Sequence, residues 1–330
     1  MSFSNATPYP GLDVPLIDFD GREVITAILK ATFEILEDGR IVPAEEPSPI
    51  RVNDEPYDAD NPHGSVRYAS DLCLEKVGTD VIVVGEAISR VPVKAMDVAV
   101  KVGTTTAPLR VHGERMFYRG LLDVAIGPAA PFERKAIVYE KAYGGVTSDS
   151  TIVELRNWAG VGVYKSKGDL VGTPAPQIEH PAHPHTGAGD KHPPVGFGAI
   201  MTHWSPRREF AGTFDELWQK TRMPLVPLDF DLRYNNVAHP SLRFDQGLSA
   251  GEPIAVVGMA ESGTVSFLLP RLPIVIRGIF EESGKVEARP PIDTLLIEPD
   301  LRRFELTVRK SFPVGRGKDI LREIRVDIDL

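Results

Sequence analysis

Apolar residues recur at every second position near both ends of the chain, and this periodicity constrains the fold most strongly. It is seen in the series Ile25, Ala27, Leu29, Ala31, Phe33 and Ile35, and again in Ile324, Val326, Ile328 and Leu330. In an extended strand, alternate side chains point to opposite faces, so such a segment buries one face of a sheet. The 29 glycines and 29 prolines make up about 18% of the 330 residues, against roughly 12% in an average protein, and long helices tolerate neither residue. We therefore expect a mainly β protein.

Further strands are predicted from short apolar or alternating runs on either side of the middle of the chain. They are expected over 80–88, 96–102, 109–117, 135–145 and 151–157, and over 252–260, 264–270, 274–280, 293–299 and 303–309. Asp38-Gly39 is typical of a tight hairpin turn. These strands predict one or two β-sandwich-like modules.

Only residues 214–222 have a convincing helical pattern. Thr213 and Glu216 match a capping box, in which each end of the motif satisfies a free backbone amide. Phe214, Leu217 and Trp218 would form an apolar stripe, and the helix would end before Pro224.

The chain divides by composition into four regions. We expect an irregular N-terminal tail (1–20), an N-terminal β region (21–157), a central insert (158–250) and a C-terminal β region (251–330). The insert is rich in proline and glycine and contains the short helix, and its first part predicts a long ordered loop or a mobile flap.

Charge and cysteine content exclude several classes of protein. The formal net charge of −9 argues against general binding to nucleic acid or to anionic membranes, which needs a basic face. Cys73 is the only cysteine, so the chain forms no internal disulfide and no cysteine-based zinc finger. The first twenty residues lack the features of a signal peptide, and no run is long and apolar enough to span a membrane. We expect a cytoplasmic protein.

Residues 196–231 concentrate aromatic and charged side chains in a short span, including Trp204 and Trp218. Closely spaced carboxylates such as Asp229 and Asp231 can perform hydrolytic acid–base chemistry. Four arginines, however, are near enough in sequence to pair with them: Arg207, Arg208, Arg222 and Arg233. Acids at 215 and 216 also suit the first turn of the predicted helix. We favour an ion-paired structural joint over a catalytic site.

A second candidate site is the histidine-rich stretch of the insert, with His180, His183, His185 and His192. Imidazole groups suit zinc or nickel, but prolines and glycines separate these residues and no metalloprotease helix motif is present. We favour a solvated polar loop and keep a metal site as the alternative. The chain has no nucleophile elbow and no complete phosphate-binding loop, so we expect no cofactor.

Several motifs, taken in order, resemble the bacterial family designated domain of unknown function 2169. They are SDLCLEKVGTDVIVVGEA (70–87), LRVHGER (109–115), YGG (143–145), PQIE (176–179), GFG (196–198), Trp204 with Pro206-Arg207, AGT-x-D (211–215), Trp218 and P-x-x-P-x-DFD (224–231). The resemblance covers roughly 65–310. It departs from the family at Trp158, where relatives commonly have proline, and in the histidine-rich stretch.

The resemblance implies a noncatalytic cytoplasmic adaptor or chaperone. Such proteins hold a toxic type VI secretion effector and help to load it on a spike of VgrG or PAAR proteins. The implied partner is thus the effector, with no nucleic acid and no membrane, and strand addition at a sheet edge is one mode of binding. The residues we expect to matter most, as signature or partner-binding residues, are Trp204, Arg207, Arg208, Trp218, Asp229 and Asp231. The alternatives are a structural component of the spike, or a β-sandwich hydrolase or metal-dependent enzyme that uses Asp229 and Asp231 or the loop from His180 to His192.

Overall fold

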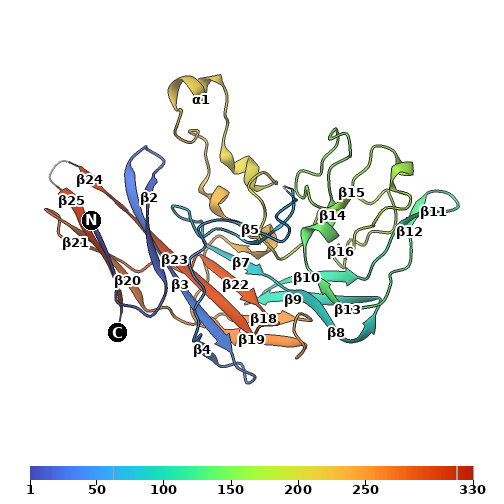
Figure 1. Cartoon of the computed structure of the whole chain (residues 1–330), viewed down its shortest axis with the longest axis horizontal. Coiled ribbons are helices and arrows are strands. Elements are labelled where there is room, and N and C mark those ends of the chain that lie inside the picture. The colour runs from blue at the N-terminus through green and yellow to red at the C-terminus, as the bar shows by residue number, and fades with distance from the viewer. Residues whose placement is uncertain (62, 317–318, 330) are drawn as a thin grey trace.

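The computed structural model describes residues 1–61, 63–316 and 319–329, and confirms a mainly β protein, with 42% strand and 8% helix. Its strands form an elongated body, and the middle third of the chain lies along one side of that body (Figure 1). No helix in the described part of the chain is long and apolar enough to cross a membrane. Leu330, the last residue of the predicted C-terminal alternation, lies outside the described residues.

The largest sheet, called the large sheet below, has seven strands. Its order is β17 (Arg243–Phe244), β7 (Thr79–Val83), β22 (Thr294–Glu298), β23 (Arg303–Pro313), β3 (Glu23–Ile35) and β2 (Gly11–Ile17), and β4 (Ile41–Pro43) pairs with β3. The two longest strands, β3 and β23, are antiparallel, with Phe33 opposite Phe304 and Leu29 opposite Val308. Their apolar residues therefore fall on the same face.

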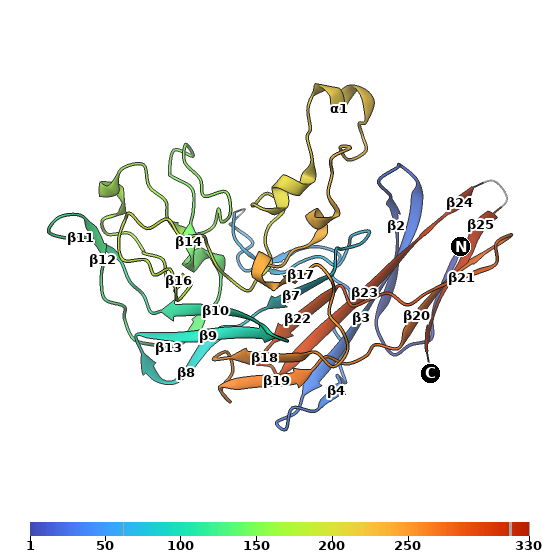
Figure 2. The same cartoon turned by 180° about the vertical axis from the view of Figure 1, so that it is seen from behind.

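Two five-stranded sheets complete the framework. One has the order β16 (Ile178–Glu179), β10 (Thr105–His112), β9 (Ala95–Val102), β18 (Pro253–Val257) and β19 (Thr264–Leu268). The other contains β1 (Ser2–Asn5), β25 (Asp319–Ile328), β20 (Ile274–Phe280) and β21 (Lys285–Ala288), with β24 (Gly315–Arg316) paired to β25. Strands from the N-terminal and C-terminal β regions thus lie side by side in the same sheets (Figure 2).

Four two-stranded pairs and short helical turns make up the rest. The pairs are β5 (Glu55–Pro56) with β6 (Val66–Tyr68), β8 (Glu86–Val93) with β13 (Phe132–Ala136), β11 (Phe117–Arg119) with β12 (Val124–Ile126), and β14 (Tyr143–Gly144) with β15 (Val161–Gly162). The 3-10 turns are η1 (Tyr139–Lys141), η2 (Lys167–Leu170), η3 (Arg207–Ala211), η4 (Leu232–Asn235) and η5 (Pro240–Leu242). The one α-helix of the described residues is α1 (Glu216–Thr221).

One apolar core joins all three sheets across the inner face of the large sheet. At one end of β23, Phe304 stacks between Phe33 and Phe267, with ring centroids 5.2 and 4.2 Å apart. At the other end, Phe312 packs so closely on Gly278 of β20 that a Cβ there would lie 2.7 Å from its ring. The two smaller sheets therefore cover successive parts of the same long strands.

Three local expectations differ from the structure. Residues 1–20 are not an irregular tail, because they hold β1, which is parallel to β25, and β2. Pro15 obscured the second strand, but a proline is tolerated on an edge strand. Residues 151–157 form no strand, and 135–145 contain only the end of β13, a 3-10 turn and β14. Residues 135–145 and 151–157 both lie in the middle third of the chain, which forms mostly loops.

Candidate functional site

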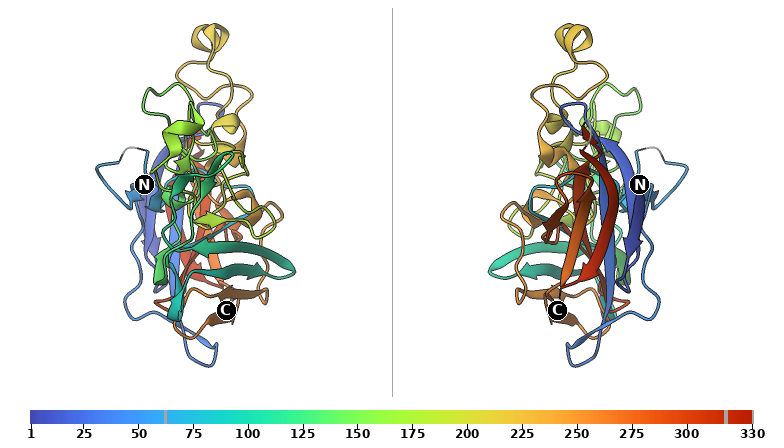
Figure 3. Two further views of the ribbon diagram at one scale, coloured as in Figure 1. Left: turned by 90° about the vertical axis from the view of Figure 1, so that its right-hand side faces the viewer. Right: turned by 90° about the vertical axis from the view of Figure 1, so that its left-hand side faces the viewer.

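Residues 205–236 leave the body of the protein and return to it, with α1 at their far end; we call this segment the arm (Figures 1 and 3). At its base Trp204 is fully buried and packs edge-on against Tyr139, with centroids 5.3 Å apart. Arg207 donates hydrogen bonds to the carbonyls of Ile200, at 2.6 Å, and Tyr234, at 3.0 Å. Arg207 therefore joins the body to the returning side of the arm.

Asp229 and Asp231 are bound within the arm. Asp231 forms an ion pair with Arg233, while the Asp229 carboxylate accepts hydrogen bonds from the amide and the hydroxyl of Thr213, at 2.9 and 2.7 Å. These bonds to Thr213 lower the pKa of Asp229. Gly212 has a φ of +83°, and a Cβ there would lie 2.8 Å from Asp229 Oδ1. Arg207 pairs with neither aspartate, because its guanidinium donates to backbone carbonyls.

The helix at the end of the arm starts later than predicted, and its cap differs. Asp215 is the N-cap, and its carboxylate accepts a hydrogen bond from the Trp218 amide at 2.8 Å. Thr213 does not cap the helix, because its hydroxyl is bound to Asp229. The predicted capping box is therefore wrong, since a stronger acceptor lies one residue before the helix.

Two side chains hold the end of the arm together. The Trp218 indole donates to the Leu225 carbonyl at 2.8 Å. Arg222 donates to the Val226 carbonyl at 2.9 Å and to the Phe19 carbonyl, and its guanidinium lies 4.5 Å from the Phe19 ring centre. The arm therefore meets the β2–β3 hairpin, and a groove of about 700 Å³ lies between the arm, this hairpin and one end of β23. Arg208 is exposed, and its side chain makes no hydrogen bond or ion pair with the described residues.

Apolar side chains on the arm face solvent. Phe214, Leu217, Met223 and Leu228 are 56%, 67%, 64% and 75% exposed. The predicted stripe of Phe214, Leu217 and Trp218 is therefore not a buried face. Among the described residues, 21 large hydrophobic side chains are exposed, and 12 of them lie between Met116 and Leu232. Exposed apolar side chains are thus more frequent in the middle third of the chain than in the rest of the described residues.

The longer sheet edges carry features that oppose strand addition. Pro15 lies in the edge strand β2, and Pro108 lies in the part of β10 that β16 leaves unpaired. β21 carries the charged Lys285 and Glu287, and the turn at Gly39 lies against the Ser266 carbonyl of β19. Prolines, charges and covering loops are the usual protection of sheet edges. These four edges are therefore protected against the addition of a further strand.

The four histidines of the predicted metal alternative do come together. Ring centroids are 5.4 Å apart for His180 and His183, 5.5 Å for His183 and His192, and 5.2 Å for His185 and His192. His185 is buried, with its Nδ1 3.4 Å from the Glu179 carboxylate. Within the described residues, however, no group of three or more histidine, cysteine or acidic side chains is arranged to hold a metal ion.

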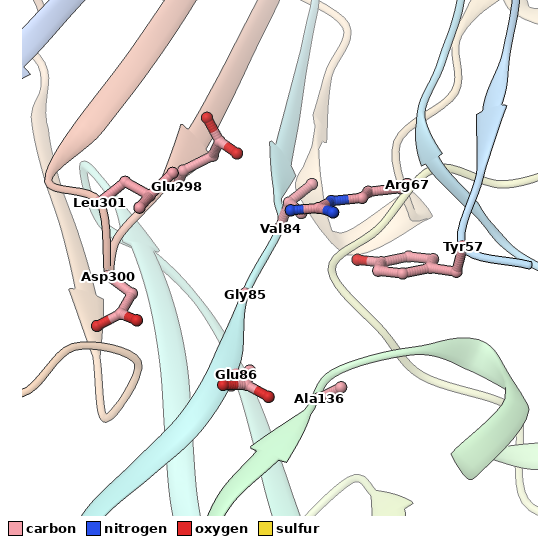
Figure 4. Close-up of a pocket in the computed structure, with 9 residues that line it drawn as sticks. All are labelled: Tyr57, Arg67, Val84, Gly85, Glu86, Ala136, Glu298, Asp300 and Leu301. Atoms are coloured by element: carbon pink, nitrogen blue, oxygen red, sulfur yellow. The ribbon is translucent and has the colours of Figure 1, made fainter.

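A pocket of about 270 Å³ lies where β7 passes into β8 (Figure 4). Its lining residues are Tyr57, Arg67, Val84, Gly85, Glu86, Ala136, Glu298, Asp300 and Leu301. Arg134 forms ion pairs with Glu86 and Asp300, and the Tyr68 hydroxyl donates to Glu298. Partial desolvation raises the pKa of the Tyr57 hydroxyl to about 12. Each carboxylate that lines the pocket is thus bound to another side chain.

Sequence reasoning missed a buried ionic network on the outer face of the large sheet. It contains four basic and four acidic side chains: Lys30, Arg51, Lys76, Arg309, Asp71, Asp80, Asp293 and Glu305. Lys76 and Asp80 belong to the motif SDLCLEKVGTD, and the Asp80 carboxylate accepts hydrogen bonds from the side chain of Asn236, at 3.0 Å, and the amide of Val237, at 2.8 Å. This motif therefore connects the large sheet to the base of the arm. The sequence does contain a signal for this network. In strands such as β23, charged residues, including Glu305 and Arg309, alternate with the apolar residues of the core face.

The fold and the arm define a mainly β protein with a projecting, partly apolar segment that a buried ionic network ties to the body. The chain belongs to the family described as uncharacterized proteins conserved in bacteria (DUF2169), whose model matches residues 20–309. No curated protein and no solved structure matches the chain.

Proposed function

We propose that the protein is a noncatalytic cytoplasmic adaptor or chaperone that binds a type VI secretion effector and helps to load it on a VgrG or PAAR spike. The observation that carries the proposal is the exposed apolar surface of the arm, formed by Phe214, Leu217, Met223 and Leu228. Apolar side chains of this kind contribute favourable free energy when a partner removes them from water. The bound carboxylates of Asp229 and Asp231 support a binding role over hydrolysis.

The signature residues divide into two roles under this proposal. Trp204, Arg207, Asp229 and Asp231 fix the base and the middle of the arm, while Trp218 holds the helix at its end. Arg208 is exposed beside the base and is free to contact the effector. A preformed arm loses less conformational entropy on binding than a flexible loop would.

The proposal is tested by co-purification with the product of a neighbouring toxin gene. We expect a stable complex, and a melting temperature of the adaptor that rises with effector concentration, because a ligand that binds only the folded state stabilises it. If the two purified proteins neither associate nor stabilise each other, the adaptor function is wrong. Stoichiometric zinc in the purified protein would instead favour a metal-dependent enzyme.

A further inference from the structure

The hairpin formed by β11 and β12, residues 117–126, carries two solvent-exposed leucines at its turn. We call this hairpin the prong. Leu121 is 100% exposed and Leu122 is 97% exposed. The two lie between Gly120 and Asp123, whose backbone amide and carbonyl close the turn at 2.9 Å. Figures 1 and 2 show the prong at one end of the molecule, well separated from α1. No other large apolar side chain is as exposed in the part of the chain that the structure describes.

The base of the prong is rigidly held, in contrast to its end. Phe117 and Val124 are buried in a small core of their own, together with Leu170, Ala175 and Ala188. Both outer edges of the hairpin are also bonded to the insert. On one edge, the Phe117 amide and carbonyl bond to residues 173 and 172, each at 2.9 Å, and on the other the Val124 carbonyl accepts from the Ala188 amide at 3.1 Å.

The proline-rich and glycine-rich insert thus fixes where the two leucines project. An exposed loop with no binding role would not require a small apolar core of its own, or backbone hydrogen bonds along both of its edges. Preorganisation of this kind favours binding, because little freedom remains to be lost when a partner covers the leucines.

Charges around the prong indicate what kind of surface it fits. Asp123 is paired with Lys167, and Lys165 with Asp149, so these groups are locally neutralised. Arg119 is exposed beside the leucines and forms no ion pair with the described residues. Arg119, together with Lys191 over the Tyr164 ring beside the small core, is too little positive charge for attachment to an anionic membrane, especially in a chain of net charge −9. A convex apolar end beside one arginine instead fits a concave apolar pocket with an acidic rim.

We propose that Leu121 and Leu122 insert into an apolar, acid-rimmed pocket on the folded part of the effector, as a second anchor separate from the arm. This inference rests on the proposed adaptor function. Two separated anchors on one rigid body raise affinity beyond that of either alone, since the second contact forms at a high effective concentration. They also fix the orientation of the bound protein, which a single arm contact would leave free to rotate.

The test compares three forms of the purified full-length protein by calorimetric titration with the neighbouring toxin gene product. They are the wild type, the double variant Leu121→Ser/Leu122→Ser and the control Leu268→Ser/Leu301→Ser. The control removes two leucines that are 62% and 63% exposed outside the middle of the chain. From the apolar area that two leucines bury, we expect the prong variant to bind about tenfold to a hundredfold more weakly. We expect the control to bind like the wild type, and all three melting temperatures to agree.

Photo-crosslinking provides a second readout. A benzophenone amino acid at position 122 should crosslink to the effector, and one at position 268 should not. Equal affinity of the wild type and the prong variant, or no crosslink from position 122, would overturn the proposal that the prong is an anchor. The proposed adaptor function would be unaffected. Failure of the wild type to bind the effector at all would overturn the adaptor function, and this inference with it.

Discussion

The Arg309 guanidinium donates two hydrogen bonds to the Asp293 carboxylate, at 2.6 and 2.9 Å, and both side chains are more than nine-tenths buried. Arg309 also donates to the Asp71 carbonyl at 2.8 Å. It therefore joins β23 to the segment before β22 and to the motif that contains Lys76 and Asp80. Because Asp80 in turn binds residues at the base of the arm, this network connects the large sheet to the arm.

Removal of one partner of this pair should strongly destabilise the protein. In Asp293→Ala, Arg309 stays buried without its carboxylate, and we expect a loss of about 3–5 kcal/mol of unfolding free energy. Urea denaturation measures this change. Replacement of both partners in Asp293→Leu/Arg309→Met should restore part of the loss, because no unpaired charge then remains buried. The exposed pair of Asp38 and Arg40 is the control, and Asp38→Ala should leave the urea midpoint unchanged. A wild-type midpoint for Asp293→Ala would contradict the role of the network.

The network also predicts how stability depends on pH. Burial alone would raise the pKa of Glu305, but hydrogen bonds from Arg51 and the charge of Lys30 lower it to about 2. A glutamate in the unfolded chain titrates near 4.3. Since the folded pKa is the lower one, the stabilisation is complete above about pH 5 and is lost as the pH falls through about 4 toward 2. Urea midpoints measured from neutral pH to about pH 3 should fall less steeply for Glu305→Gln than for the wild type. Parallel curves would show that Glu305 does not carry this dependence.

The contact between the arm and the β2–β3 hairpin should depend on Arg222. In Arg222→Ala the bonds to the Phe19 and Val226 carbonyls are lost, and we expect faster amide hydrogen exchange at residues 18–22 and 224–228. The melting temperature should change little, because the core is elsewhere. Lys220→Ala, which removes an exposed side chain from the preceding helix α1, serves as the control. Unchanged exchange in Arg222→Ala would show that the arm is held by other contacts.

The sequence predicted the sheet-forming segments well wherever one face is apolar. Alternation in β3 and β25 is a local property of the chain, so the strands could be found without knowing their partners. It could not show that β23 pairs with β3 and β22 with β7, because these pairings join residues more than 200 positions apart. Pro15 also hid β2, since a proline is acceptable in a strand only once its edge position is known.

The candidate site was predicted in part. Among the dense charges of residues 196–231, Asp231 is paired with Arg233, one of the four arginines expected to be available to it. Asp229 binds Thr213 instead of an arginine, and Arg207 and Arg222 bind backbone carbonyls. Sequence spacing indicates which charges are near one another but not which acceptor lies within reach of a guanidinium. Likewise, no pattern distinguishes the bare leucines of the prong from core residues, because exposure depends on the whole fold.

The affinity of an arm variant for the effector tests the central claim most directly. Leu217→Ser/Leu228→Ser removes two side chains that are 67% and 75% exposed, so folding should be unaffected. Calorimetric titration against the neighbouring toxin gene product should show binding about tenfold to a hundredfold weaker than that of the wild type, because both leucines lose their apolar contact with the effector. The same affinity for this variant and the wild type would contradict the account, because the arm would then not be the surface that holds the effector.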